Sequence, residues 1–249
     1  MAETISKSVF SGDKNFDYDG TDLEYLEDMD NLYNMILSKF DDYIGENLLE
    51  VGAGIGTFSK SILNRYNKNL IAIEPSKMIN KLKQSLAEEI STKKITPLSG
   101  FLNNNLQNLK KIDTIFYNNV LEHIKDDEIE LQIAYDVLQP GGHILTYTPA
   151  NPSLYCEMDQ EIGHYRRYTL FEMKGKMQKA GFVIKEGYYH DFVGMILMYI
   201  KYKILKMTKL SKKNVSLYFN TILPLLDKIE PSRLLPNGKN IFVIAQKPL

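Results

Sequence analysis

The chain lacks tryptophan and has a single cysteine, Cys156, among its 249 residues. One thiol cannot form a disulfide within the chain or supply a cage of thiolate ligands, which excludes disulfide-stapled scaffolds and zinc fingers. No segment with the charged and apolar pattern of a secretory leader opens the sequence, so the default expectation is a cytoplasmic protein.

An excess of charge of one sign is also absent. Thirty lysines and arginines face 31 aspartates and glutamates, for a net charge of -1, so the strongly basic character typical of nucleic-acid binders is missing. We therefore predict no nucleic-acid partner. At 44% hydrophobic and 24% charged residues, the chain has the composition of an ordinary globular protein with a full core.

Long apolar runs are missing as well. The apolar run at 192–200 is far shorter than the roughly 20 residues that cross a bilayer. Six lysines follow it without an acidic residue among them, which leaves two interpretations: a core-packed helix with a solvated basic end, or a helix at a membrane surface. These lysines are Lys201, Lys203, Lys206, Lys209, Lys212 and Lys213.

Three alternate glycines, Gly52, Gly54 and Gly56, follow the apolar run 48–51 and precede a helix-compatible segment. This order predicts a strand, a tight turn and a helix, with a ligand lying against the turn. The spacing does not match G-x-G-x-x-G, because position 57 is threonine, and no Gly-Lys-Ser/Thr follows as in a phosphate-binding P-loop. Both phosphate-binding interpretations are therefore weakened.

Two acidic residues near the turn indicate a different ligand. Glu50 puts a carboxylate at the mouth of the site, where it would repel a pyrophosphate and attract a cation such as a sulfonium. Glu74 ends the next apolar run, about 20 residues beyond the glycines, at the spacing that places a carboxylate on ribose hydroxyls. Adenosine joined to a cationic sulfur satisfies both.

Strand-like and helix-like segments alternate along the rest of the chain, which predicts an α/β fold with a parallel sheet covered on both faces. An amphipathic helix is expected between Asp22 and Phe40. Strands are expected at 47–51, 69–74, 95–98, 114–117, 143–148, 182–186 and 240–245. Helices are expected at 56–66, 76–90, 127–138 and 169–180, the last with a capping box from Thr169 to Glu172.

Four motifs in order resemble those of class I S-adenosylmethionine-dependent methyltransferases. They are Glu50-x-Gly52-x-Gly54-x-Gly56, Glu74, Asn119-Val120-Leu121-Glu122-His123, and Leu138-Gln139-Pro140-Gly141-Gly142. The resemblance covers about residues 45–190 and implies a Rossmann-like, seven-stranded, mostly parallel sheet with helices on both faces and an antiparallel last strand. The alternative is a Rossmann-like domain with a different ligand site.

We interpret the chain as one methyltransferase domain over residues 1–249. A helical cap would occupy 1–44, the Rossmann-like core 45–189 and 238–249, and a helical insertion before the last strand 190–237. The resemblance implies S-adenosylmethionine as cofactor, with the glycine turn at its methionine part, Glu74 at the ribose, and Phe101 near the adenine where many relatives carry an acid. The implied cofactor-binding residues are Glu50, Gly52, Ala53, Gly54, Gly56, Glu74, Pro75, Gly100, Phe101, Asn119 and Val120.

The run Gly163-His164-Tyr165-Arg166-Arg167-Tyr168 resembles a block found in bacterial methyltransferases that act on sugars, lipids or other secondary metabolites. His164 could act as a base, and Arg166 and Arg167 could clamp an anionic group of the acceptor. The alternative is an internal lock, in which either arginine pairs with Asp159 or Glu161. Tyr165 and Tyr18 are further acceptor-binding candidates, and His123 and His190 are further base candidates.

These residues predict transfer of the S-adenosylmethionine methyl group to a hydroxyl of a small molecule, and the two arginines suggest an anionic group on that molecule. N-methylation of an amine is the first alternative. A non-catalytic module that binds S-adenosylmethionine and regulates or scaffolds a partner is the second. No grouping of histidine, cysteine and acidic residues has metal-ligand spacing in the sequence, so no metal is predicted.

Overall fold

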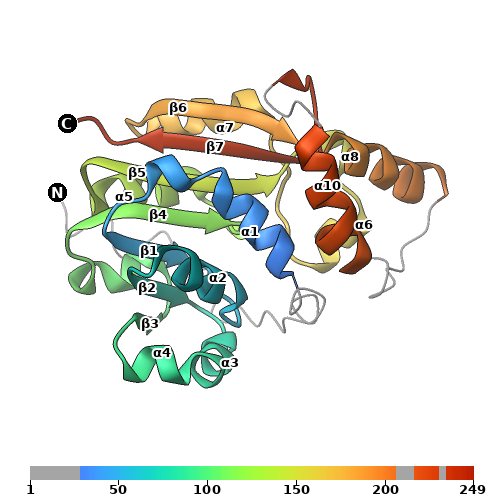
Figure 1. Ribbon diagram of the computed structural model, residues 1–249. Coiled ribbons are helices and arrows are strands. Elements are labelled where there is room, and N and C mark those ends of the chain that lie inside the picture. The colour runs from blue at the N-terminus through green and yellow to red at the C-terminus, as the bar shows by residue number, and fades with distance from the viewer. Residues whose placement is uncertain (1–28, 206–215, 230–233) are drawn as a thin grey trace.

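The structure is a computed structural model that describes residues 29–205, 216–229 and 234–249. Seven strands form one sheet in the order β3-β2-β1-β4-β5-β7-β6 (Figure 1). All neighbours are parallel except β7, which runs antiparallel to β5 and β6. The predicted Rossmann-like architecture is confirmed. The strands are β1 (Asn47–Val51), β2 (Asn69–Glu74), β3 (Ile95–Ser99), β4 (Ile112–Asn118), β5 (Leu138–Pro149), β6 (Val183–His190) and β7 (Asn240–Gln246).

Helices cover both faces of this sheet (Figure 1). The α-helices are α1 (Asp30–Ser38), α2 (Thr57–Tyr66), α3 (Met78–Ser85), α4 (Ala87–Ser91), α5 (Asp127–Val137), α6 (Glu157–Glu161), α7 (Leu170–Lys179), α8 (Phe192–Met198) and α10 (Leu223–Ile229). Short 3-10 or π-helical segments are η3 (Asp41–Tyr43), η4 (Leu102–Asn108), η5 (Leu121–His123), η6 (Pro152–Leu154), η7 (Tyr199–Ile204) and η8 (Tyr218–Ile222).

The core has two layers because successive side chains of a strand point to opposite faces. In β1, Leu48 packs into the cluster that contains α1, α2 and α3, whereas Leu49 packs into the cluster that contains α5 and α7. In β4, Phe116 packs into the first of these clusters and Ile115 into the second. Parallel strands covered on both faces in this manner bring their carboxyl ends to one edge, where loops are free to build a site.

Several element boundaries differ from the sequence-based expectation, and β6, expected to end at 186, extends to His190. The helix predicted over 76–90 is divided into α3 and α4 at Leu86, whose φ of -116° and ψ of 30° are not helical. β5 was expected to begin at 143, but it begins at Leu138 and runs through Pro140 and the two glycines. The part of the first predicted helix before residue 29 lies outside the described residues.

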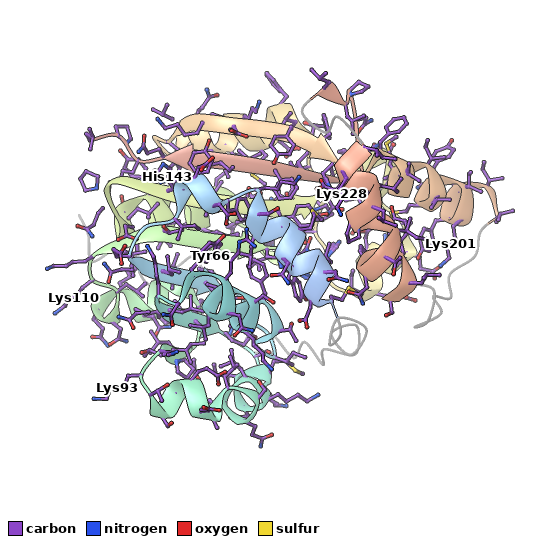
Figure 2. All side chains as sticks on the ribbon, in the orientation of Figure 1. Tyr66, Lys93, Lys110, His143, Lys201 and Lys228 are labelled. Carbon is purple, nitrogen blue, oxygen red and sulfur yellow. The ribbon has the colours of Figure 1, made fainter. Side chains whose placement is uncertain are left out.

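The segment between β6 and β7 is helical where it is described, with α8, η7, η8 and α10. None of the helices within the described ranges has both the length and the hydropathy that crossing a bilayer requires. Lysine side chains at Lys93, Lys110, Lys201 and Lys228 project from widely separated parts of the molecule (Figure 2).

Candidate active site

The turn after β1 packs directly against the loop after β4. Gly52 has a φ of 75°, and a Cβ placed on it would lie 2.5 Å from the Val120 side chain. Any other residue at position 52 would therefore be strained in its backbone and would push Val120 away. The glycine at this position is what lets the loop that carries η5 lie beside the turn.

Glu74 ties the glycine turn to the end of β2. Its Oε2 accepts a hydrogen bond from the backbone N of Gly54, and its Oε1 accepts one from the backbone N of Ser76, both at 2.8 Å. Each oxygen of an ionised carboxylate can accept a second hydrogen bond, so both retain the capacity to bind a hydroxyl group. This geometry is compatible with the predicted contact to the two ribose hydroxyls.

Glu50 is buried below the turn, with 2% of its surface exposed. Burial raises the pKa of its carboxyl group to about 7, and the nearby Glu74 adds to this, whereas a hydrogen bond from Ser59 Oγ to Glu50 Oε2 at 2.5 Å opposes it. The Glu50 carboxyl group is therefore bound to Ser59 inside the fold. Its predicted attraction for a cationic cofactor would act electrostatically and without direct contact.

The other predicted cofactor residues lie at the same sheet edge, in the loops after β1, β2, β3 and β4. The backbone N of Gly100 donates to the O of Glu74 at 3.1 Å, and that of Asn119, with a φ of 52°, donates to the O of Tyr147 at 2.8 Å. Phe101 caps the start of η4. The fold thus brings together, as one edge, Glu50, Gly52, Ala53, Gly54, Gly56, Glu74, Pro75, Gly100, Phe101, Asn119 and Val120; their contact with a cofactor stays a prediction.

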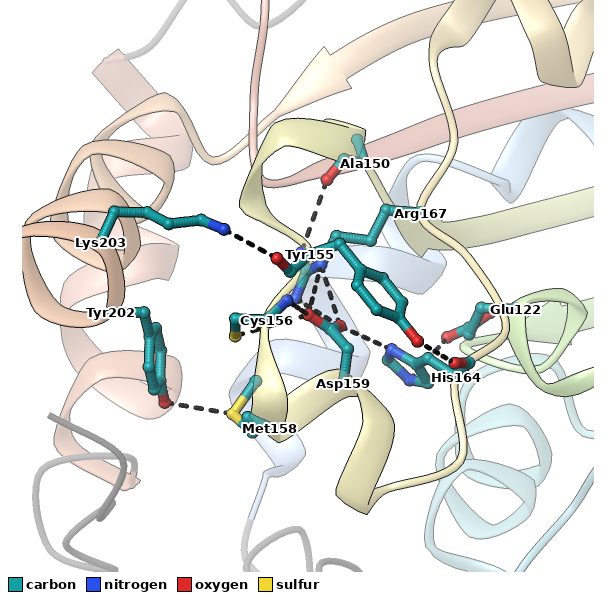
Figure 3. A network of polar contacts seen from close by, with 10 residues as sticks. All are labelled: Glu122, Ala150, Tyr155, Cys156, Met158, Asp159, His164, Arg167, Tyr202 and Lys203. Carbon is teal, nitrogen blue, oxygen red and sulfur yellow. Dashed lines mark hydrogen bonds and ion pairs between the residues drawn. The ribbon is translucent and has the colours of Figure 1, made fainter. Parts of the chain in front are cut away.

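Within the histidine and arginine block, Arg167 forms a buried ion pair with Asp159 (Figure 3). Its Nε lies 2.9 Å from Asp159 Oδ1, and its Nη2 lies 2.8 Å from the same oxygen. The same carboxylate binds His164 Nδ1 at 2.8 Å. Burial alone would raise the pKa of Asp159, but the hydrogen bonds from His164 and Arg167 together outweigh it and lower the pKa to about 2.

Arg166 and Tyr168 meet a second buried carboxylate, Asp127 at the start of α5. Arg166 Nη1 lies 2.8 Å from Asp127 Oδ1, and its Nη2 donates to the O of Lys125 at 2.6 Å. Tyr168 Oη donates to Asp127 Oδ2 at 2.8 Å. Both arginines of the block are therefore engaged inside the protein, which favours the internal lock over a clamp on the acceptor; for Arg166 the partner differs from the two that were expected.

The fold brings Glu122, His123 and His164 together, with one ligand-type atom of each within 4.8 Å of the others. Glu122 is fully buried, and burial raises the pKa of its carboxyl group to about 7, against the opposing charge of His164. Burial, with a smaller effect from His164, lowers the pKa of His123 to about 3. The backbone N of Tyr165 donates to the O of Glu122 at 2.8 Å, which fixes the two loops to each other.

Sequence spacing alone did not single out Glu122 as a site residue, and it did not predict that His123 and His164 would face each other. Their ring centroids are 4.6 Å apart. The available signal was the motif Leu121-Glu122-His123, which forms η5 just after β4, at the sheet edge where the later block also lies.

The remaining base candidate, His190, lies at the end of β6 with its side chain fully buried. Its Nδ1 lies 3.3 Å from Tyr147 Oη, and its Nε2 lies 3.2 Å from Asp227 Oδ1 on α10. With both ring nitrogens engaged, His190 has the contacts of a structural residue. Tyr18, the other predicted acceptor contact, lies outside the described residues.

Comparison with known proteins gives a consistent family. A family model described as a methyltransferase domain matches residues 25–186. An uncharacterised methyltransferase of Oceanobacillus iheyensis is 34% identical over 131 residues, which are 51% of this chain and 57% of that protein. Malonyl-(acyl-carrier protein) O-methyltransferase 1 of Ilyobacter polytropus is 27% identical over 150 residues, which are 55% of this chain and 53% of that protein.

A solved structure gives the same fold. Phosphoethanolamine N-methyltransferase 2 of Haemonchus contortus, in complex with S-adenosyl-L-methionine, superposes with a TM-score of 0.60 at 17% identity, over 87% of this chain and 53% of that protein. The chain thus spans about half the length of these relatives. Their acceptor groups, as named, include both oxygen and nitrogen.

Proposed function

Because this chain belongs to the family of methyltransferase domains, whose cofactor is S-adenosylmethionine, we propose that it transfers the methyl group of that cofactor to a hydroxyl of a small molecule. The reaction is an in-line displacement at carbon that neutralises a sulfonium charge. The protein's main task is therefore to align acceptor, methyl group and sulfur in a site that excludes water.

The arrangement of His164 supports the choice of a hydroxyl acceptor. Asp159 accepts a hydrogen bond from Nδ1, which leaves Nε2 as the nitrogen able to take up a proton. This nitrogen lies beside η5, the turn that follows β4 at the cofactor edge. A positioned base of this kind accelerates attack by a hydroxyl by about 100- to 10,000-fold.

Within the block, we assign acceptor contact to His164 and Tyr165. Tyr165 is 48% exposed, while its backbone N donates to the O of Glu122. Arg166 and Arg167 would act as positioning residues through Asp127 and Asp159. An anionic group on the acceptor is accordingly not part of the proposal, and the likeness of the block to those of sugar, lipid and secondary-metabolite methyltransferases supports a small molecule.

We also propose that the chain is divided into a helical cap, a Rossmann-like core and a helical insertion. The helical insertion contacts the loop of the block, since Lys203 Nζ donates to the O of Tyr155 at 2.8 Å and Tyr202 Oη donates to Met158 Sδ at 3.1 Å (Figure 3). We infer that the insertion shapes the acceptor side of the site, because such additions gather at the carboxyl edge of a doubly wound sheet.

The test has two stages. Isothermal titration should show binding of S-adenosylmethionine and of S-adenosylhomocysteine, and absence of both would contradict the proposal. A panel of hydroxyl and amine acceptors, followed by release of S-adenosylhomocysteine, should then give turnover with hydroxyls. Turnover with amines alone would favour N-methylation, and binding without turnover on any acceptor would favour a regulatory or scaffold module.

A further inference from the structure

The Glu122 carboxyl group lies in the interior, and Nε2 of His164 lies 3.8 Å from its Oε1. Its side chain is fully buried, and neither carboxylate oxygen has a hydrogen bond to another of the residues that the structure describes. A buried carboxyl group without a hydrogen-bond donor is either neutral or stabilised by a cation, such as a charged side chain or a metal ion. The position can therefore accommodate a cation beside His164.

His164 is oriented as a metal-binding histidine would be. Its Nδ1 is fixed by Asp159 at 2.8 Å, and Asp159 is in turn held by Arg167. A histidine that binds a metal with one ring nitrogen typically donates the other N–H to a carboxylate, which fixes the tautomer and the ring orientation. The free Nε2 of His164 faces Glu122 Oε1 at 3.8 Å, which is too long for a hydrogen bond.

The distance of 3.8 Å between His164 Nε2 and Glu122 Oε1 is close to the distance between two ligand atoms on one metal ion. With metal–ligand distances of about 2.0 to 2.2 Å, a nitrogen and an oxygen on a tetrahedral zinc ion lie about 3.4 Å apart. His123 supplies a third donor, and one ligand-type atom from each of the three residues lies within 4.8 Å of the others. Small side-chain movements would bring all three to one ion.

We propose that Glu122, His123 and His164 bind a divalent transition-metal ion of the zinc class. Two imidazoles and one carboxylate favour such an ion over magnesium or calcium, which prefer oxygen ligands. Three protein ligands leave a position open for another molecule, as in catalytic metal sites. Glu122 is fully buried, and 8% of the His164 side chain is exposed, so the three donor groups lie close beneath the surface.

The open position on the ion could bind the acceptor hydroxyl, and this part of the inference rests on the proposed function. A hydroxyl bound at the open position is acidified by the ion and releases its proton to solvent. The oxygen then forms the bond to the methyl carbon as the carbon–sulfur bond breaks, and the electron pair stays on the sulfur of S-adenosylhomocysteine. With the ion bound, His164 would hold the metal, and the ion would take over the activation of the hydroxyl that we assign to His164 in the metal-free protein.

The experiment uses the full chain, freed of metal by a chelator and then titrated with zinc against a competing indicator dye. The wild type should bind one zinc ion per chain more tightly than the dye does, and magnesium should not displace it. Glu122→Gln and His123→Gln should each weaken zinc binding by about 100-fold or more, and Asp159→Asn by about 10- to 100-fold. His143→Asn is the matched control, since His143 packs on Tyr43 outside the cluster, and it should bind zinc normally.

No stoichiometric zinc binding by the wild type, or equal binding by wild type, Glu122→Gln and His123→Gln, would overturn the proposal. Circular dichroism identifies variants that fail to fold, and the partly exposed His123 provides a variant with little effect on the core. Titration with S-adenosylmethionine on the same samples separates the two ideas. Methyl transfer without zinc binding would refute only the metal site, and zinc binding without any cofactor binding would refute only the proposed function.

Discussion

At the scale of single residues, carboxylates near the carboxyl edge of the sheet differ in what they contact. The Glu74 carboxylate accepts hydrogen bonds from two backbone amides, and that of Glu50 accepts one from a serine hydroxyl. The carboxylate oxygens of Glu122 accept none from other residues in the described part of the chain. A carboxylate already held by backbone donors is preorganised to accept further hydrogen bonds without moving. This is why Glu74 is the residue to which we assign direct binding of the cofactor.

Glu74→Ala should weaken S-adenosylmethionine binding by about 1 to 3 kcal/mol, because charged hydrogen bonds to the ribose hydroxyls are lost. It should also lower the melting temperature, because the backbone N–H groups of Gly54 and Ser76 lose their acceptor. Isothermal titration and thermal unfolding measure the two effects. Glu46→Ala, at an exposed residue paired with Lys68, is the control, and it should change neither. Unchanged cofactor affinity in Glu74→Ala would show that the ribose lies elsewhere.

Arg167→Lys tests whether the arginine positions the block. Lysine keeps the charge but loses the fork that binds Asp159, so we expect about 1 to 3 kcal/mol of destabilisation, measured by urea unfolding. The matched control is Arg65→Lys, which alters a similar but exposed pair with Asp41 and should cost less than about 1 kcal/mol. Activity per folded molecule should change little; a raised Michaelis constant for the acceptor at unchanged stability would instead support the clamp.

At the scale of elements, hydrophobic patterning predicted which segments are strands and helices, and local backbone geometry set where they end. Apolar periodicity continues across 76–90, but Leu86 leaves the helical region and divides the segment, which periodicity does not detect. β5 continues through Pro140, a residue that ordinarily argues against a strand. The positions of Glu50 and Glu74 at the sheet edge followed from the ends of β1 and β2, which hydrophobic patterning locates.

Asp227 connects three elements that the sequence does not relate to one another. Its carboxylate binds Lys39 just after α1 at 2.6 Å and His190 at the end of β6 at 3.2 Å, and thereby fixes α10. Asp227→Ala should destabilise the protein by about 2 kcal/mol, since the buried His190 loses a partner. Proteolysis should then cut faster within 190–237, whereas Asp42→Ala, at an exposed position, should leave the rate unchanged. An unchanged cleavage pattern in both variants would show that α10 is held by its apolar contacts.

At the scale of the whole molecule, the acceptor side of the site depends on contacts between segments that are far apart in sequence. Asp159 and Glu122 acquire their roles only because the loop after β5 folds back onto the loop after β4. Composition and periodicity carry no information about which loops come into contact. They also do not distinguish a histidine or acidic residue that binds a ligand from one that binds another side chain. The sequence therefore predicted the histidine and arginine block as a candidate but not the residues that orient it.

The buried carboxyl groups of the core predict how stability depends on pH. Burial raises the pKa of Glu130 to about 7, although the hydrogen bond from Tyr117 Oη at 2.9 Å opposes this, and Glu50 behaves similarly. Between the ordinary glutamate pKa of about 4.3 and the folded value, the folded state holds protons that the unfolded state has released. The free energy of unfolding should therefore be largest near the lower end of this window and fall as pH rises through it.

Glu130→Gln should remove about 1 to 3 kcal/mol of that decline between pH 5 and pH 8, because the amide does not titrate but can still accept the hydrogen bond from Tyr117. Urea unfolding of the ligand-free protein at a series of pH values measures the slope in each variant. Glu46→Gln, whose side chain is 80% exposed, is the matched control, and it should retain the wild-type slope. If the wild type is equally stable across this range, or if Glu130→Gln keeps the full decline, then Glu130 stays ionised inside the folded protein and its burial is compensated by a group other than Tyr117.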